Sequence, residues 1–338
     1  MRIFLSFAML LWCNAFVFAQ EPDWIRGKSR EYPDEFYIVG VGSGDTRHDA
    51  ESRARAHIAE VFSVNIKADI SVNKSETLRQ HEGKVSGESK EIARSKIDMG
   101  LKKTLEGSEI VEVWQNPRDA VYYALAVLDR EKAALKMSER IRELDNELLK
   151  LGEEADTVSG KVNKLKLMLL QRSLLSDRLS LDSDFRIVSP SAKSIKAPFS
   201  YTEEISGITK FLQNDFVIGI SGRGPGADVL AQTVTDLFTG RGFMVDRTGG
   251  RGADLLIEIN ATTDPSTQPV GEWYYCRWRV ELNASDPSTH SVIMSASEKG
   301  KSGQLSVDES KRKALFDMNK KTAFIASKLL DKLTGGEE

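Results

Sequence analysis

The chain has 338 residues, a formal net charge of −3 and two cysteines. Its length exceeds what one hydrophobic core usually holds, so we expect two domains. A near-neutral charge excludes the strongly basic surface that nucleic-acid binding requires, and no nucleic-acid partner is expected.

Residues 1–19 have the pattern of a secretory signal peptide. Arg2 is the only charged residue among them, and an apolar run from Ile3 to Trp12 follows it. The run is too short to span a bilayer, and small residues precede a cleavage site after Ala19. We therefore expect an exported, periplasmic protein whose mature chain begins at Gln20.

Lipidation of Cys13 would instead anchor the chain in the outer membrane. The residue before a lipidated cysteine should be small, whereas Trp12 is large, so this anchor is disfavoured. Removal of the signal peptide leaves Cys276 alone. The mature chain would then have no internal disulfide and would depend on its hydrophobic core.

Residues 20–130 are predicted to form a first domain. Residues 37–41 are a strand, and Thr46 can cap the helix that follows because Asp49 comes three residues later. The helix has an apolar face made of Ala50, Ala54, Ile58, Val61 and Phe62. The polar, weakly alternating residues 67–99 suggest an extended antiparallel hairpin. Residues 110–114 and 120–128 suggest a second hairpin, turned by residues 116–119.

Residues 131–183 are predicted to be helical. Apolar residues recur at spacings of 3 and 4 from Ala134 to Leu169, as in five heptads. One interpretation is a continuous helix of about 45 residues, which needs a partner chain and would make a homo-oligomer through residues 134–169. The other is an antiparallel helical hairpin that turns near Thr157 to Gly160. The unbroken register slightly favours the continuous helix. Residues 184–214 are expected to be a linker.

Residues 215–338 are predicted to repeat the order of the first domain. A strand ends at Ile220, and strands follow at residues 243–245, 255–259, 273–282 and 291–296. Two helices have clear apolar stripes, which are Ala227, Leu230, Ala231, Val234, Leu237 and Phe238 in one and Leu315, Met318, Thr322, Ile325, Leu329 and Leu333 in the other. The predicted class is α+β, with two β-α-β-β-β(-α) domains of mainly antiparallel sheet joined by a long coiled-coil-like helical segment.

Two glycine-rich segments follow strands and precede helices, at Gly40 to Gly44 and Gly222 to Gly226. Such turns cradle phosphates, and the second matches a dinucleotide fingerprint with Asp246 at the end of the next strand. Pro225 inside the turn, the lack of repeated crossover helices and an exported location argue against this interpretation. We expect both segments to be strand-to-helix corners and predict no nucleotide cofactor.

The sequence gives little sign of catalysis or metal binding. The histidines at positions 48, 57, 81 and 290 are scattered, and no G-x-S-x-G motif occurs. Carboxylate pairs at residues 153–154 and 203–204 are interpreted as solvated faces. We therefore expect no enzyme activity, no catalytic residue, no metal site and no cofactor.

One strand combines aromatic and basic residues on a single face. Alternation places Trp273, Tyr275, Arg277 and Arg279 together, opposite a face that suits the core. Tryptophan, tyrosine and arginine are enriched in binding hot spots, so these four residues are the candidate partner or ligand surface. An ordinary outer sheet face, or one covered by the C-terminal helix, is the favoured alternative.

Residues 22–140 resemble a known family in the order and spacing of their motifs. Pro22-Asp23-Trp24, the strand with Gly40 and Gly42, the alanine-rich helix, Trp114 and Tyr122 to Ala126 are similar to the LPP20 lipoprotein family. The amino-terminal domain of flagellar assembly protein T has a similar pattern. The resemblance implies an envelope protein associated with the outer membrane, in some members with flagellar or motility structures, and no catalysis.

The second half is similar, more loosely, to the amino-terminal domain of TolB. Residues 230–247 and 252–257 carry this resemblance, which implies a structural role for Asp246 and no nucleotide. Together these features predict a non-enzymatic protein that supports an envelope or flagellar structure through contacts with envelope or flagellar proteins. Peripheral association with the outer membrane is compatible with this role. The alternative is a periplasmic module that binds a glycan or an anion.

Overall fold

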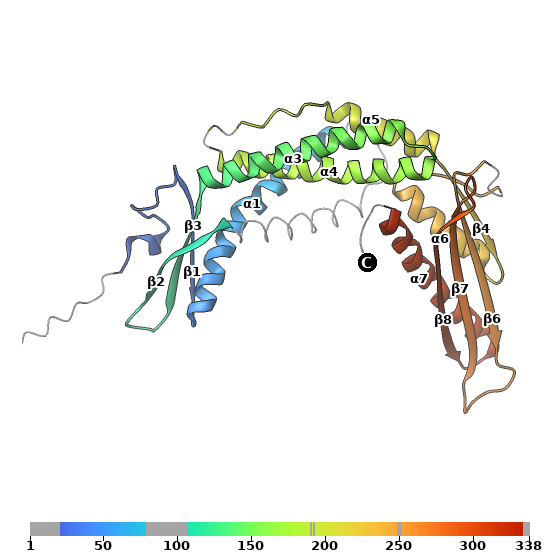
Figure 1. Cartoon of the computed structure of the whole chain (residues 1–338). Helices are drawn as coiled ribbons and strands as arrows, with labels where there is room; N and C mark the ends of the chain where they lie inside the picture. Colours follow the sequence, from blue (N-terminus) through green and yellow to red (C-terminus); the bar gives the residue numbers. More distant parts are fainter. Residues whose placement is uncertain (1–20, 79–106, 190, 192, 249–251, 334–338) are drawn as a thin grey trace, which may run out of the picture. The chain divides into compact units, whose positions relative to one another are not determined.

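The computed structural model describes residues 21–78, 107–189, 191, 193–248 and 252–333 (Figure 1). Two compact units divide the chain: residues 1–138 with 183–194, and residues 139–182 with 195–338. The expected signal peptide, Cys13 and most of the predicted hairpin at residues 67–99 lie outside the described residues. The predicted α+β class is confirmed, since helices pack against antiparallel and mixed sheets.

The first unit contains a three-stranded antiparallel sheet, covered by a helix. Strands β1 (Tyr37–Gly44), β3 (Tyr122–Asp129) and β2 (Glu109–Gln115) lie in that order. Helix α1 (Arg47–Leu78) covers one face (Figure 1). Its predicted N-cap is confirmed, because the Asp49 amide donates to Thr46 Oγ1 at 3.1 Å.

Helix α1 continues beyond its predicted end. The hairpin predicted from residue 67 is therefore wrong for residues 67–78, which are helical. The weak polar alternation there was a poor guide because half of residues 67–78 are Lys, Ala, Asp, Asn or Glu, which are depleted in strands. In the described part of this unit, two strands, β1 and β2, precede β3.

The glycines of the first predicted corner lie inside strand β1. A Cβ on Gly40 or Gly42 would overlap the backbone of Ala54 in α1, and one on Gly44 would lie 2.7 Å from the Cβ of Asp49. None of the three has a positive φ. The prediction of a glycine bend is therefore wrong here: these positions lack side chains because helix and strand touch backbone to backbone.

The opposite face of this sheet is covered by the segment that precedes β1. Trp24 lies in the short 3-10 helix η1 (Asp23–Arg26), is 2% exposed and packs with Leu125 and Val127 of β3. This contact gives a structural role to Pro22-Asp23-Trp24, the first of the motifs noted in the sequence. Strand β3 is consequently buried on both faces.

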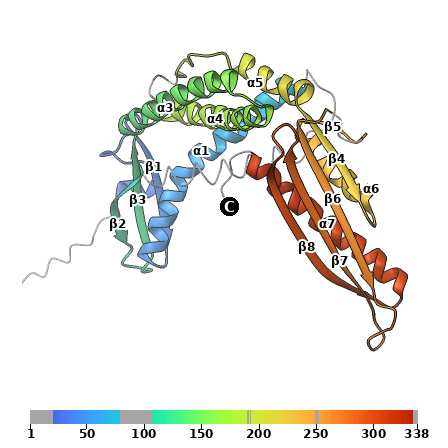
Figure 2. The ribbon, with the colours of Figure 1, turned by 45° about the vertical axis from the view of Figure 1, so that its right-hand side comes forward.

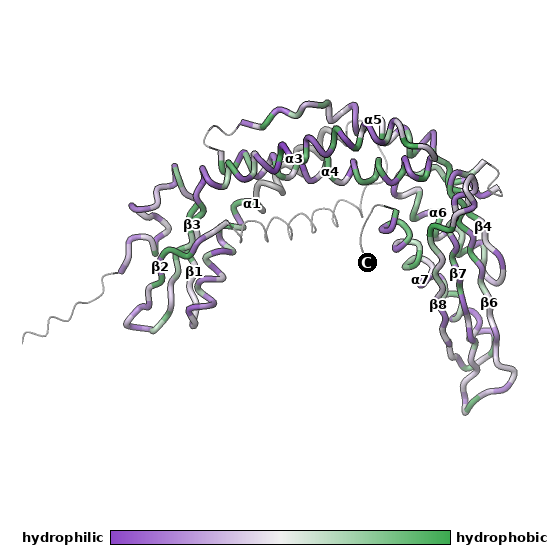
Figure 3. The backbone as a smooth tube through the Cα atoms, viewed as in Figure 1, coloured by the Kyte–Doolittle hydropathy of each residue, from purple (hydrophilic) through white to green (hydrophobic). Residues whose placement is uncertain are grey.

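The heptads form an antiparallel helical hairpin. Helix α3 (Arg130–Thr157) ends before a turn in which Gly160 has φ +86°, and α4 (Lys161–Val188) runs back beside it. The prediction of a continuous helix is therefore wrong. The chain turns at Gly160, since glycine adopts this left-handed conformation readily. Figure 3 shows hydrophobic and hydrophilic residues alternating along both helices. The buried heptad residues include Ile141, Leu144, Leu148, Leu151, Ala155, Val162, Leu165 and Leu169.

The predicted linker at residues 184–214 is mostly helical. Helix α4 continues to Val188, and α5 (Tyr201–Lys210) is followed by the π-helical turn η2 (Phe211–Asp215). Ser200 caps α5, since its side chain accepts a hydrogen bond from the Glu203 amide. Serine followed three residues later by glutamate is a capping-box signal, which the linker prediction overlooked.

The second unit contains a five-stranded mixed sheet in the order β5-β4-β6-β7-β8. Its strands are β4 (Val217–Arg223), β5 (Met244–Asp246), β6 (Leu255–Pro265), β7 (Tyr274–Asp286) and β8 (Ser291–Gln304). Strand β4 is parallel to β5 and β6, and the remaining pairs are antiparallel. The order here is thus β-α-β-β-β-β-α. All five strands expected along the sequence are present, which is one strand more than the β-α-β-β-β(-α) order predicted for both domains.

Two helices share one face of this sheet. Helix α6 (Ala227–Gly240) packs on β4 and β5, and α7 (Val307–Leu333) lies along β7 and β8 (Figure 2). Cys276, Trp278, Val280 and Leu282 of β7 belong to this buried side. The candidate residues Arg277 and Arg279 alternate with them and therefore lie on the other face.

Candidate functional site

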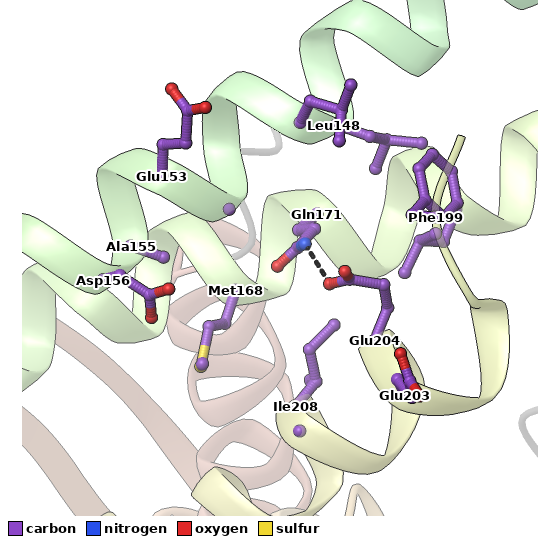
Figure 4. Close-up of a pocket in the computed structure, with 14 residues that line it drawn as sticks. Leu148, Glu153, Ala155, Asp156, Met168, Gln171, Phe199, Glu203, Glu204 and Ile208 are labelled. Carbon is purple, nitrogen blue, oxygen red and sulfur yellow. Dashed lines mark hydrogen bonds between the residues drawn. The ribbon is translucent and has the colours of Figure 1, made fainter. Parts of the chain in front are cut away.

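A groove of about 360 Å³ lies between α3, α4 and α5 in the second unit (Figure 4). Its floor is apolar and its rim is acidic. The apolar lining residues are Leu148, Leu149, Ala155, Met168, Leu175, Phe199 and Ile208, and the polar ones are Glu153, Asp156, Gln171, Glu203 and Glu204. The lining contains no basic residue, no cysteine and no hydroxyl-bearing residue.

Two local features shape the groove. Gly152 of α3 has no side chain, and a Cβ there would lie 3.6 Å from Gln171 Nε2. Gln171 is 4% exposed and donates from Nε2 to Glu204 Oε2 at 2.7 Å, which joins α4 to α5 (Figure 4). This buried hydrogen bond holds the mouth of the groove in one geometry.

The four carboxylates create a negative potential around the apolar floor. Asp156 pairs with Lys164 at 3.6 Å, although its side chain is 82% exposed. Glu153 and Glu203 are exposed and make no ion pair within the described residues. Glu153, Glu203 and Glu204 belong to the pairs that the sequence suggested were solvated faces, so their common edge was missed. An apolar floor beneath carboxylates suits a segment with apolar and basic side chains.

A buried ion cluster lies between α3, α4 and the segment before α5. Arg178 of α4 is 1% exposed, and its Nε donates to Asp145 Oδ1 of α3 at 2.9 Å. Its Nη1 lies 3.4 Å from Asp182 Oδ1, and its Nη2 donates to the carbonyl of Ile195 at 2.8 Å. Burial, the largest single effect, lowers the pKa of Arg178, but the hydrogen bond to Asp145 and the charges of Tyr201, Asp145 and Asp182 together raise it above its ordinary value. The cluster ties both helices to the segment that leads into α5.

The residues predicted as a partner or ligand surface do share one sheet face. Arg277 and Arg279 are exposed, and Trp273, which precedes β7, is 46% exposed. Tyr275 lies over Gly303 of β8, where a Cβ would be 2.8 Å from its ring. Helix α7 packs on the opposite face, so it does not cover these four residues. Whether they bind anything stays a prediction.

Strand β8 adds two lysines that the sequence interpretation missed. Lys299 pairs in register with Arg279, and Lys301 pairs with Arg277. The ammonium of Lys301 lies 3.6 Å from the centroid of the Tyr275 ring. The two arginines and the two lysines line a groove of about 540 Å³ with Thr262, Thr263 and Asp264 of β6. The alternation of lysine and glycine from Lys299 to Gly303 was the available signal, but glycine lowers the apparent strand propensity.

The second glycine-rich segment is a packed corner, as expected. Gly224 has φ +94°, and its Cβ would overlap the carbonyl of Ala261, while a Cβ on Gly226 would lie 2.7 Å from Leu315. Asp246 accepts hydrogen bonds from the hydroxyl and amide of Thr248, and these bonds lower the pKa of Asp246. The turn and the acid are thus occupied by the chain itself.

The remaining chemical groups are dispersed. Cys276 is a free, buried thiol whose pKa is raised by burial, which makes it a poor nucleophile. His48, His57 and His290 are exposed. Among the described residues, no group of three or more His, Cys, Asp or Glu side chains could hold a metal ion. Nor does any helix in that part of the chain have the length and apolar composition needed to cross a membrane.

The comparisons with known proteins concern the first unit most directly. The model of the LPP20 lipoprotein family matches residues 22–129. No curated protein matches the chain significantly. The resemblance of the first predicted domain to this family is therefore confirmed over that range.

Solved structures give weaker similarities. The secreted protein HP1454 from Helicobacter pylori matches with a TM-score of 0.44 and 14% identity, over 86% of this chain and 97% of its own. A minor lipoprotein from Acinetobacter baumannii matches with a TM-score of 0.26 and 10% identity, over 35% of this chain and 90% of its own. Rare lipoprotein B from Shewanella oneidensis gives a TM-score of 0.24 and 12% identity, over 35% and 94%. These scores are too low to support any inference about function, and the LPP20 lipoprotein family remains the assignment of residues 22–129.

Proposed function

We propose that this chain is a non-enzymatic protein of the cell envelope that supports assembly of an envelope or flagellar structure by binding partner proteins. The lipoprotein family match over residues 22–129 and the expected signal peptide support the envelope location. The flagellar connection rests only on the resemblance of the first domain to flagellar assembly protein T. The periplasm is the expected compartment, and no catalytic step is assigned.

The acid-rimmed groove between α3, α4 and α5 carries the proposal. Its floor offers apolar contacts. Glu153 of α3 and Glu203 and Glu204 of α5 lie at its rim, so one basic segment could contact carboxylates of both helices. A partner segment with apolar residues flanked by lysine or arginine complements this arrangement. Burial of the floor would provide affinity, and the rim would select the charge of the partner.

A photo-reactive amino acid in place of Leu149 tests the proposal in cells. Leu149 lines the groove and is 43% exposed, so its replacement should leave the fold intact. We expect a discrete crosslinked envelope protein. Leu179 of α4 is 48% exposed but lies outside the lining, and the same probe there should give no such product.

Charge reversal at the rim provides the second arm. Glu153→Lys with Glu203→Lys should abolish the crosslink from position 149, because the basic partner would then meet like charges. Glu147→Lys changes an exposed α3 residue outside the groove and should leave the crosslink unchanged. An equal product with the rim variant, or equal products from positions 149 and 179, would contradict the proposal.

Self-association through residues 134–169 stays a prediction. The hairpin buries most of the apolar heptad side chains within the chain, including Leu148 and Leu165 in the core of the second unit. Sedimentation equilibrium of the purified mature chain tests it directly. A concentration-dependent mass that changes on substitution of exposed residues in this range would support an oligomer.

A second candidate function is binding of an anionic glycan on the sheet face of the second unit. Arg277, Arg279, Lys299 and Lys301 lie there in two cross-strand pairs, next to the aromatic rings of Trp273 and Tyr275. Trp273→Ala with Tyr275→Ala should remove binding to an immobilised acidic glycan without altering the circular dichroism spectrum. Retained binding in that variant would exclude this face.

A further inference from the structure

The outward side of α7 carries a row of aromatic and basic residues that winds along the helix. The row, here called the α7 ridge, repeats every four residues and consists of Arg312, Phe316, Lys320, Phe324, Lys328 and Lys332. All six are exposed. Each step of four residues advances about 40° around a helix of 3.6 residues per turn, so the six side chains wind across the exposed side of α7, and Phe316, Lys320 and Phe324 lie within about 80° of one another.

Both phenylalanines of the α7 ridge are unusually open to solvent. Phe316 is 53% exposed and Phe324 is 49% exposed. They are two helical turns apart, about 12 Å at 1.5 Å per residue. The helix already buries a complete apolar stripe against the sheet, including Met318, Ile325 and Leu329, so these rings are not required by the core.

Each exposed ring is bracketed by two ammonium groups. Lys313 and Lys320 lie 4.9 and 4.7 Å from the centroid of Phe316. Lys321 and Lys328 lie 5.7 and 4.9 Å from the centroid of Phe324. The α7 ridge therefore presents apolar tips with positive charge immediately beside them.

Two acids near this helix pair with lysines that flank the exposed rings. Asp317 accepts from Ser302 Oγ at 2.7 Å and pairs with Lys313 at 3.0 Å, on the side that faces β8. Glu298 of β8 pairs with Lys321 at 3.6 Å. On the other flank, Thr233 of α6 hydrogen-bonds to Asn319. No acidic residue belongs to the ridge itself, and α7 carries seven basic and four acidic residues, so its net charge is positive.

We propose that the α7 ridge is a docking surface for an anionic lipid bilayer. A helix in the interfacial plane binds membranes by placing aromatic rings at the acyl boundary and basic groups at the phosphates. The ridge has both groups on the exposed side of the helix, and the lysine stems are long enough to reach the headgroups while the rings enter. A single strip of side chains offers little area for a protein partner, and neither groove described above contains a ridge residue.

Vesicle co-sedimentation of the purified mature chain tests this surface. Vesicles of phosphatidylethanolamine with phosphatidylglycerol should bind the chain, and vesicles of phosphatidylcholine alone should bind it much more weakly. Lys320→Gln with Lys328→Gln should lower the partition coefficient on anionic vesicles by about 10- to 30-fold. Phe316→Ser with Phe324→Ser should lower it by roughly tenfold or more, because the apolar contribution is lost.

Two matched controls separate the ridge from other exposed features of the same unit. Lys299→Gln with Lys301→Gln removes the same number of charges from the sheet face and should reduce binding by less than about twofold. Val292→Ser removes another exposed apolar residue, which is 67% exposed on β8, and should have no effect. Circular dichroism should show equal folding of all variants.

Three results would overturn the proposal. These are no binding to anionic vesicles, equal binding to neutral vesicles, and loss in the sheet-face variant without loss in either ridge variant. The test does not involve the groove between α3, α4 and α5. Its outcome is therefore independent of the partner-binding proposal.

Discussion

Arg178 shows how one buried charge organises part of the second unit. Its guanidinium meets Asp145, Asp182 and the carbonyl of Ile195 within a site that is almost closed to water. Such a cluster is not itself a strong source of stability, because burying the charges opposes their attraction. Its value here is positional, since it joins α3, α4 and the segment before α5 at one point.

Removal of this cation should be severely destabilising. Arg178→Leu removes the cation that pairs with the buried carboxylates of Asp145 and Asp182, and we expect the free energy of unfolding to fall by about 3–5 kcal/mol. Chemical denaturation followed by circular dichroism measures this change. Arg140→Leu is the control, since the Arg140–Glu143 pair is exposed and should contribute at most about 1 kcal/mol. Similar small changes in both variants would show that the cluster is not structural.

Tyr201 provides a pH-dependent signal from the same region. Its hydroxyl is buried and has no hydrogen-bond partner among the described residues. Burial raises the pKa of Tyr201 to about 12, although the nearby Arg178 cation opposes this change. The phenol of an unfolded chain titrates near pH 10, so the folded state retains a proton that the unfolded state has lost between these values.

The free energy of unfolding should therefore fall as pH rises from about 10 to 12. Below pH 10 the contribution of Tyr201 is fully present. Tyr201→Phe should flatten this part of the profile, and it should preserve stability at neutral pH because no hydrogen bond is lost. Denaturant titrations at several alkaline pH values give the comparison. An unchanged slope in the variant would mean that other groups control alkaline unfolding.

Among the secondary-structure elements, contact between β1 and α1 explains the first glycine-rich segment. Gly40 and Gly42 lie where the strand meets the backbone of Ala54, and small residues on β3 and α1 complete the layer. The sequence pattern of spaced glycines correctly indicated a special backbone position. It did not distinguish a bend from a close approach, because both require the absence of a Cβ.

Gly42→Ala should weaken this layer. The added methyl would overlap the α1 backbone, and overpacking of this kind costs about 1–3 kcal/mol. Gly207→Ala is a control of opposite sign, because Gly207 lies in α5 with no atom within 4 Å of its new Cβ. That change should stabilise by about 0.5–1 kcal/mol. Thermal denaturation measures the midpoint temperature of each variant. A shift of both midpoints in the same direction would contradict the packing argument.

Element prediction succeeded where periodicity was strong. The apolar stripes of α6 and α7 and the strands at β2 and β3 appear close to their predicted positions. It failed at β8, whose predicted end at residue 296 falls eight residues short of Gln304. Gly300 and Gly303 lower strand propensity, but they accommodate the rings of Trp278 and Tyr275 from β7. Cross-strand neighbours decided that element, and a single strand does not reveal them.

For the whole molecule, the division into two compact units predicts two unfolding events. Leu165→Ala removes a fully buried side chain from the core of the second unit, and its transition should lose about 2–5 kcal/mol. Gly42→Ala should lower the other transition. Differential scanning calorimetry of both variants separates the events. A single transition shifted by either substitution would show that the chain unfolds as one cooperative body.

The sequence by itself determined the elements with regular spacing and the resemblance of residues 22–129 to the LPP20 lipoprotein family. Its spaced glycines also marked the places where the backbone needs special room. It also left the heptads with two solutions, because the same apolar spacing suits a long helix and a folded pair. The tertiary structure decided for the hairpin, through the left-handed Gly160 and the contacts of Asp145 with Arg178. It also brought Glu153, Glu203 and Glu204 to one groove. Spacing along a chain sets which faces are apolar, but only packing decides which faces meet.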